Sequence, residues 1–92
     1  MDISIIIINF NSSNFTINCI ESIYKYTKDV TFEIIVVDNN SASEDKKTLS
    51  DFLENKPITF VKSKINLGFG GGNHFGYQFA KGNHYAFINN DA

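Results

Sequence analysis

The sequence predicts an α/β domain in which helices cover both faces of a parallel β-sheet. Two aliphatic runs, Ile5–Ile8 and Ile34–Val37, show no polar alternation, which is typical of strands buried on both faces. Apolar residues at helical spacing follow each run, and the whole chain gives the order βαβαβαβ. Strands that alternate with helices favour a parallel sheet, joined by right-handed crossovers, as the middle layer of a three-layer sandwich.

Four segments are the predicted strands. Ile3–Phe10 and Phe32–Asp38 contain the two aliphatic runs. Ile58–Val61 is a shorter third strand, and Pro57 before it is tolerated because a proline can stand at the start of a strand. Tyr85–Ile88 is the fourth.

Three helices are predicted between these strands. Their apolar stripes are Ile17, Ile20, Ile23 and Tyr24 in the first, Leu49, Phe52 and Leu53 in the second, and Phe75, Phe79 and Ala80 in the third. We expect Ser12, Ser13 or Asn14 to cap the first helix and a capping box at Ser41–Glu44 to begin the second. Gly82 is the expected end of the third.

Length and composition restrict the class of protein. Residues 1–92 suffice for a single domain, and 42% hydrophobic residues with a net charge of −2 argue against disorder. The basic residues are all lysines and form no cluster, which argues against a nucleic-acid partner. The single cysteine, Cys19, excludes an internal disulfide, so a cytoplasmic location is expected. The longest aliphatic runs are far below the ~20 residues of a membrane span.

Polar residues follow each predicted strand. They form the clusters Asn9–Asn11, Asp38–Ser41, Asn66 with the glycines after it, and Asn89–Asp91. In a parallel sheet these ends lie on one edge, where ligands bind beside the point at which the strand order reverses. The alternative is that each cluster is an ordinary polar turn, because Asn and Asp are common in turns. Four clusters together favour a binding site.

The stretch Gly68–Gly72 holds four of the six glycines and precedes a predicted helix. Glycines allow the backbone to approach a ligand, and a helix N-terminus favours phosphate. The stretch matches neither dinucleotide-binding nor Walker motifs, because Asn73 and Phe75 stand where the dinucleotide pattern needs glycine. A flexible surface loop is the alternative.

Individual side chains at this edge admit two interpretations each. Phe10 is suited to stack on a flat ring or to pack in the core. Asp38 is placed to accept a hydrogen bond from a base N–H or to cap the second helix. Asn89 and Asp91 offer oxygen ligands suited to Mg²⁺ on a diphosphate, although their N-x-D spacing is common.

The chain resembles the N-terminal half of a family 2 glycosyltransferase with the GT-A fold, of the rhamnosyltransferase-like type. The matching segments cover nearly the whole chain and are Ile3–Asn11, Cys19–Ile23, Glu33–Ser41, Asn66–Gly76 and Phe87–Ala92. The resemblance implies the nucleotide-binding, Rossmann-like half of that fold, with the four strands in the order 3-2-1-4.

The resemblance also implies a site for a nucleotide-diphospho-sugar donor. The implied donor-binding residues are Asn9, Phe10, Asn11, Asp38, Asn40, Gly70, Gly71, Gly72, Asn73 and Asn90. Asp91, with Asn89, is the implied ligand set for Mg²⁺ or Mn²⁺. Asn89 departs from the family pattern, which has an acidic residue there.

The implied reaction is transfer of a sugar to an acceptor hydroxyl in cell-surface polysaccharide synthesis, with a glycan or a lipid-linked sugar as acceptor. The catalytic base is expected beyond Ala92, so we expect residues 1–92 alone to bind a donor without transferring sugar. We expect the full-length protein to act in the cytoplasm at the inner face of the membrane. The fourth strand is expected to leave one sheet edge unpaired, which favours self-association.

Two other functions remain open at this point. One is a folded module that binds nucleotide without chemistry, or does not bind it at all. The other is a flavodoxin-like signalling domain with Asp38 as phosphoacceptor. The second is disfavoured because the first strand ends in Asn9–Asn11 and not in an acidic pair.

Overall fold

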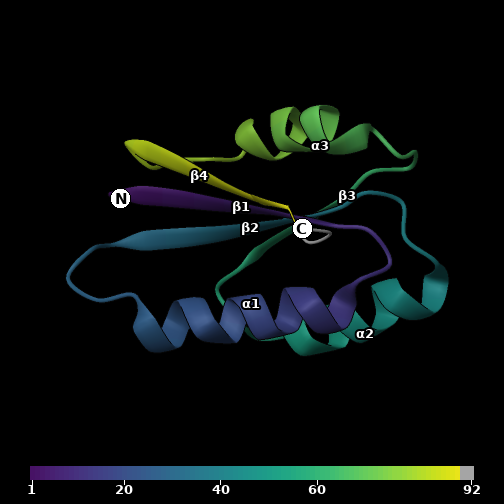
Figure 1. The fold of residues 1–92 in the computed structure, drawn as a ribbon, viewed down its shortest axis with the longest axis horizontal. Coiled ribbons are helices and arrows are strands. Elements are labelled where there is room, and N and C mark those ends of the chain that lie inside the picture. The colour runs from purple at the N-terminus through teal and green to yellow at the C-terminus, as the bar shows by residue number, and fades with distance from the viewer. Residues whose placement is uncertain (90–92) are drawn as a thin grey trace.

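A computed structural model describes residues 1–89 and shows three layers. Helix α3 covers one face of the sheet, and α1 and α2 cover the other (Figure 1). The elements are β1 (Ile3–Asn9), α1 (Ser13–Tyr26), β2 (Phe32–Asp38), α2 (Ser43–Leu53), β3 (Thr59–Lys62), α3 (Gly68–Tyr77) and β4 (His84–Asn89). Within the described residues, no helix combines the length and the apolarity that a bilayer crossing requires.

The sheet is parallel with the order β3-β2-β1-β4, which confirms the predicted fold class. Asn9 pairs with Asp38 at the carboxyl end of β1 and β2, and Ile8 pairs with Asn89 at the carboxyl end of β4. The chain order therefore reverses beside β1. The residues that follow β1 and β2 leave the sheet at the same edge.

The two aliphatic strands are buried on both faces, as predicted. Alternate residues face α1 and α2 and form one core cluster, with Ile5, Ile7, Ile34, Val36, Ile20, Leu49 and Leu53. The residues between them face α3 and form the second cluster, with Ile6, Ile8, Ile35 and Val37. This parity matters for the site, because a polar residue after either strand continues one of the two rows.

The glycine-rich stretch is helical, so the prediction of a loop before the third helix is wrong. Helix α3 begins at Gly68, whose φ of 71° is left-handed. A Cβ at Gly76 would lie 2.8 Å from methyl carbons of Ile6 and Val37, and one at Gly72 would lie 3.2 Å from Ile8 Cδ1. Glycine is therefore used here to bring the helix close to the sheet.

The predicted ends of the helices also need correction. Helix α3 ends at Tyr77, before Gly82, whose N–H instead donates to Ser4 Oγ at 2.8 Å. Ser12, one of the three predicted caps, is the N-cap residue of α1, but its side chain makes no cap hydrogen bond. The helix begins at Ser13, whose N–H donates to Asp45 Oδ1 of α2 at 2.9 Å. The N-cap of α2 is Ala42, which has no side-chain oxygen, so the predicted capping box is not formed. Tertiary contacts replace local caps at these ends.

Candidate functional site

A buried polar network surrounds Asn9 at the carboxyl end of β1. Asn9 is 0% exposed. Its Nδ2 lies 3.1 Å from Asp38 Oδ1, 3.2 Å from Ser41 Oγ and 2.9 Å from Asp45 Oδ2. Its Oδ1 accepts a hydrogen bond from the Thr16 hydroxyl at 2.7 Å. The Asn9 amide is thus directed into the protein, where it joins β1, β2, α1 and α2.

Asp38, also 0% exposed, fixes the loop that follows β2. Its Oδ2 accepts a hydrogen bond from the Ser41 N–H at 3.0 Å, while Oδ1 faces Asn9. Asp38 therefore does not cap α2, which was one of its two predicted roles. The carboxylate holds residues 39–41 in a tight turn, and Asn40 at its tip is exposed.

The loops after β1 and β2 are tied together by reciprocal hydrogen bonds. The Asn11 N–H donates to Ser41 Oγ at 2.9 Å, and Asn11 Oδ1 accepts from the Ala42 N–H at 2.7 Å. Asn11 and Asn40 have left-handed φ angles of 51° and 69°, which asparagine tolerates better than most residues. Ser41 was missed as a site residue, because the sequence assigned it to the capping box.

Asn39 attaches the third polar segment to the same edge. Its Oδ1 accepts a hydrogen bond from the Leu67 N–H at 2.8 Å, and its Nδ2 donates to the Gly68 carbonyl at 3.0 Å. Asn39 lies on the α3 side because its parity along β2 is opposite to that of Asp38. The sequence contained this signal, but Asn39 was not predicted.

The described residues of the predicted donor site that are exposed are Phe10, Asn11, Asn40, Gly70 and Gly71. Phe10 is 43% exposed, which contradicts the core interpretation of this side chain. Gly72 is buried against Ile8 and Asn39.

Asn73 adds a second unusual feature to the α3 side of this edge. Its Oδ1 is buried and finds no hydrogen-bond partner among the described residues. Tyr77, one helical turn further along the same face, packs its ring against Tyr85 of β4. Asn73 therefore lies toward β4, and its buried oxygen remains able to accept a hydrogen bond.

The pKa of the Asp45 carboxyl is lowered by its hydrogen bonds in the network. Partial burial alone would raise the pKa of the Asp45 carboxyl. Hydrogen bonds from the Asn9 amide and from Ser13 outweigh this effect and hold the pKa below its ordinary value. Asp45 is therefore a carboxylate at neutral pH and acts as the acceptor that joins α2 to the start of α1.

The predicted metal ligands cannot be placed from this geometry. The backbone of Asn89 ends β4 beside Ile8, but its side chain, Asn90 and Asp91 lie outside the described residues. Among the residues that are described, no group of three or more His, Cys, Asp or Glu side chains is arranged to hold a metal ion.

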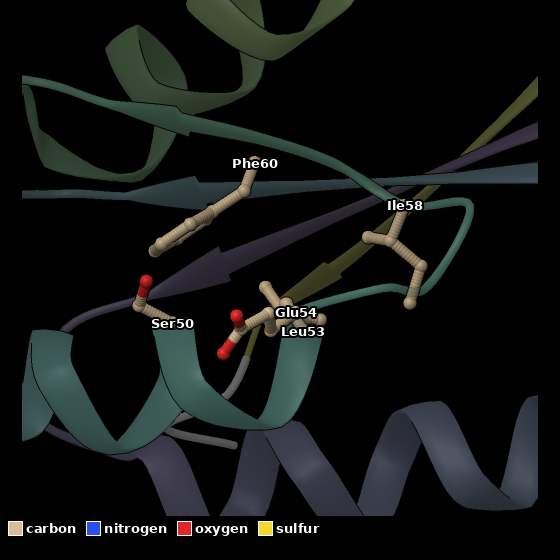
Figure 2. A pocket seen from close by; sticks show the side chains of 5 residues that line it. All are labelled: Ser50, Leu53, Glu54, Ile58 and Phe60. Atoms are coloured by element: carbon tan, nitrogen blue, oxygen red, sulfur yellow. The ribbon is translucent and has the colours of Figure 1, made fainter.

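One pocket lies at the edge of the sheet that carries the predicted site. A polar groove of 430 Å³ lies at the carboxyl edge, on the α1 and α2 side, and is lined by Asn11, Ser13, Asn14, Ala42, Glu44, Asp45 and Thr48. A smaller pocket of 220 Å³ lies between α2 and β3 (Figure 2), lined by Ser50, Leu53, Glu54, Ile58 and Phe60. None of the predicted site residues lines the second pocket, so we do not assign it to the site.

Comparison with known proteins finds a matching family model and a related hexosyltransferase. A family model described as glycosyl transferase family 2 matches residues 4–92. The low-salt glycan biosynthesis hexosyltransferase Agl10 of Haloferax volcanii is 34% identical over 79 residues, which cover 86% of this chain and 23% of that protein. The chain thus spans about a quarter of the length of this relative.

Solved structures share the fold. The structure of S. aureus TarS in complex with UDP-GlcNAc matches 99% of this chain and 27% of its own, with a TM-score of 0.80 and 22% identity. The mannosyltransferase PcManGT from Pyrobaculum calidifontis, in complex with GDP-Man and Mn²⁺, matches 98% of this chain and 27% of its own, with a TM-score of 0.78 and 22% identity. The architecture of residues 1–89 is therefore that of the predicted Rossmann-like half of the GT-A fold.

Proposed function

Because the chain belongs to glycosyl transferase family 2, we propose that it forms a binding site for a nucleotide-diphospho-sugar donor. One observation carries the proposal. Three segments far apart in the sequence, Asn9–Asn11, Asp38–Ser41 and the start of α3, meet at one edge of the sheet through direct hydrogen bonds. An open parallel sheet binds ligands at this edge.

The exposed groups at the edge suit the parts of such a donor. Phe10 offers an aromatic face on which the nucleobase stacks, and Asn40 offers an exposed amide on the loop after β2. The N-terminal turn of α3 carries a partial positive charge that favours the diphosphate. Gly70 and Gly71 are exposed there, and a Cβ at Gly70 would face open space. The buried Asn9 and Asp38 hold the two loops in place, a role that we now assign to both in preference to direct contact.

A divalent cation is the proposed cofactor. The solved structure of PcManGT is a complex with GDP-Man and Mn²⁺, which supports Mg²⁺ or Mn²⁺ as the metal. We propose that Asp91, with Asn89, holds it on the donor, and that it stabilises the charge developing on the leaving diphosphate.

Sugar transfer itself is assigned to a larger unit than residues 1–92. The chain matches only 23% of the curated relative, so the acceptor and the catalytic base are proposed to involve further residues. In that larger unit we propose a glycan or lipid-linked sugar as acceptor, a role in cell-surface polysaccharide synthesis, and action on the cytoplasmic side of the membrane. The relative's name, a glycan biosynthesis hexosyltransferase, supports this class of acceptor.

Ligand-dependent stability tests the donor site. We expect UDP or GDP with Mn²⁺ to raise the melting temperature of the 92-residue protein, because a ligand at 100 times its Kd adds about 2.7 kcal/mol to the folded state. The control is the Phe10→Ala protein with each nucleotide at the same concentration, and its melting temperature is expected to rise less. If neither nucleotide at millimolar concentration changes the melting temperature, the donor site is not formed by these residues. Metal-dependent sugar transfer by the 92 residues would contradict the assignment of transfer to a larger unit.

Self-association is proposed through β4. Among the described residues, β4 pairs only with β1, and its six residues include neither lysine nor proline, which commonly protect edge strands. Tyr85 and Phe87 on this strand are also exposed. Sedimentation equilibrium is expected to show dimers at high protein concentration, and a monomer throughout would refute this proposal.

A further inference from the structure

Asn39 is the side chain that connects the sheet to the start of α3. It is 3% exposed. Both of its polar atoms are bonded to backbone groups 28 and 29 residues away, with Oδ1 accepting from Leu67 and Nδ2 donating to Gly68. The amide is therefore committed to the protein backbone and is not directed toward a ligand.

The first turn of α3 receives this attachment at a glycine of unusual conformation. Gly68 has a left-handed φ of 71°, and the Gly68 N–H is held by Asn66 from within the same segment. Through its two hydrogen bonds, Asn39 links that turn to the end of β2. One turn later, a Cβ at Gly72 would lie 3.4 Å from Asn39 Nδ2, so the amide also lies directly under the helix.

The chemistry of the contact requires a neutral amide. The Oδ1 atom must accept a hydrogen bond from the Leu67 N–H, and the atom at the Nδ2 position must donate one to the Gly68 carbonyl. Among side chains of this size, an amide does both at neutral pH. An aspartate keeps the acceptor but places a carboxylate oxygen against the Gly68 carbonyl. A protonated aspartic acid restores a donor there.

We propose that Asn39 is a positioning residue that fixes the first turn of α3 at the place where the donor diphosphate binds, without touching the ligand. This inference rests on the proposed donor site. In this proposal, the hydrogen bonds of Asn39 set the distance between the end of β2 and the exposed backbone at Gly70 and Gly71.

The test compares Asn39→Asp with the unchanged protein across pH. Binding of UDP and GDP with Mn²⁺ is measured by calorimetry between pH 7.5 and pH 5, and folding is followed by circular dichroism. At pH 7.5 we expect Asn39→Asp to bind about tenfold more weakly, which corresponds to the loss of one buried hydrogen bond. Burial at this position, 3% exposed in the unchanged protein, raises the pKa of the introduced carboxyl. As the pH falls, the ratio of the two dissociation constants is therefore expected to approach one, because the protonated carboxyl donates to Gly68 again. Titration of the nucleotide and of other carboxylates affects both proteins and cancels in the ratio.

Controls separate this inference from the proposed function. Asn18→Asp adds the same charge at an exposed position of α1 and is expected to bind as the unchanged protein does at every pH. Asn39→Ala removes both hydrogen bonds without a charge and is expected to stay weak at every pH. If the unchanged protein binds neither nucleotide, the proposed function fails. If it binds and Asn39→Asp binds equally well, or if its weakness does not depend on pH, the positioning role is refuted. Unfolding of both Asn39 variants would also refute it, because Asn39 would then be needed for the fold as a whole.

Discussion

The close packing of α3 on the sheet can be tested by adding one methyl group. At Gly76 a Cβ would lie 2.8 Å from Ile6 Cγ2 and from Val37 Cγ2. Both side chains are fully buried and β-branched, so neither can rotate away easily. Overpacking of this kind costs roughly 1–3 kcal/mol, and alanine recovers about 1 kcal/mol of helix propensity relative to glycine. Since two rigid contacts are too short, we expect Gly76→Ala to lower the free energy of unfolding by about 1–2 kcal/mol.

Gly70→Ala is the matched control in the same helix. A Cβ at Gly70 would meet no heavy atom of the described residues within 4 Å outside its own helix and its chain neighbours. The substitution is therefore expected to raise the free energy of unfolding by about 0.5–1 kcal/mol through helix propensity alone. The same substitution in the same helix is thus expected to change the free energy of unfolding in opposite directions at the two positions.

Thermal and urea unfolding, both followed by circular dichroism, measure this difference. For a domain of this size 1 kcal/mol corresponds to about 4–8 °C, so the two variants are expected to differ in melting temperature by roughly 10 °C. Nucleotide binding gives a second readout, because Gly70→Ala places a methyl group where we propose the diphosphate approaches. It should be more stable and bind more weakly. If Gly76→Ala is as stable as Gly70→Ala, α3 does not lie as close to the sheet as the structure shows.

Three further predictions concern the polar edge. Asn9→Ala is expected to lower the free energy of unfolding by about 2–4 kcal/mol, since Asp38, Thr16 and Asp45 lose a buried partner; a change below 0.5 kcal/mol in urea unfolding, roughly the scatter of neutral surface substitutions, would contradict this. Asp45 has a lowered pKa, so the stability it contributes is present at neutral pH and is lost as the pH falls through its folded pKa. The difference in free energy of unfolding between the unchanged protein and Asp45→Asn should therefore shrink in acid. A difference that stays constant from pH 7 to pH 3 would contradict this role of Asp45. Phe10→Ala should weaken nucleotide binding about tenfold, because stacking on one base contributes roughly 1–3 kcal/mol, with little effect on stability; an unchanged Kd would remove Phe10 from the site.

The sheet could be predicted from the sequence because its signal is local and strong. Four consecutive isoleucines at Ile5–Ile8 leave no polar face, so both faces of the strand must be covered. The strand ends differ from prediction by a residue at most, as at β1, which ends at Asn9 and not at Phe10. The strand order came from the family resemblance and not from the residues alone.

The glycine-rich helix could not be predicted from local propensity. Glycines at Gly68–Gly72 disfavour a helix by about 1 kcal/mol each, so the sequence favoured a loop. The helix forms because Gly72 and Gly76 allow the backbone to pack on β1 and β2, and this contact depends on residues more than 30 positions away. The helix caps failed for the same reason: Asp45 caps α1 from another helix, which no pattern around Ser13 reveals.

Strand parity explains how the end of β2 serves both sides of the sheet. Ile34, Val36 and Asp38 form one row, and Asp38 continues it into the polar network toward α1 and α2. Val37 and Asn39 belong to the other row, and Asn39 continues it to α3. Asp38 and Asn39 thus continue the two buried rows of β2. We expect their substitution to change both the stability of the fold and the binding surface. If substitution of Asp38 or Asn39 weakens nucleotide binding, the stability of the variant must be measured before a ligand contact is inferred. Phe10 is exposed, so weaker binding after its substitution indicates a ligand contact directly.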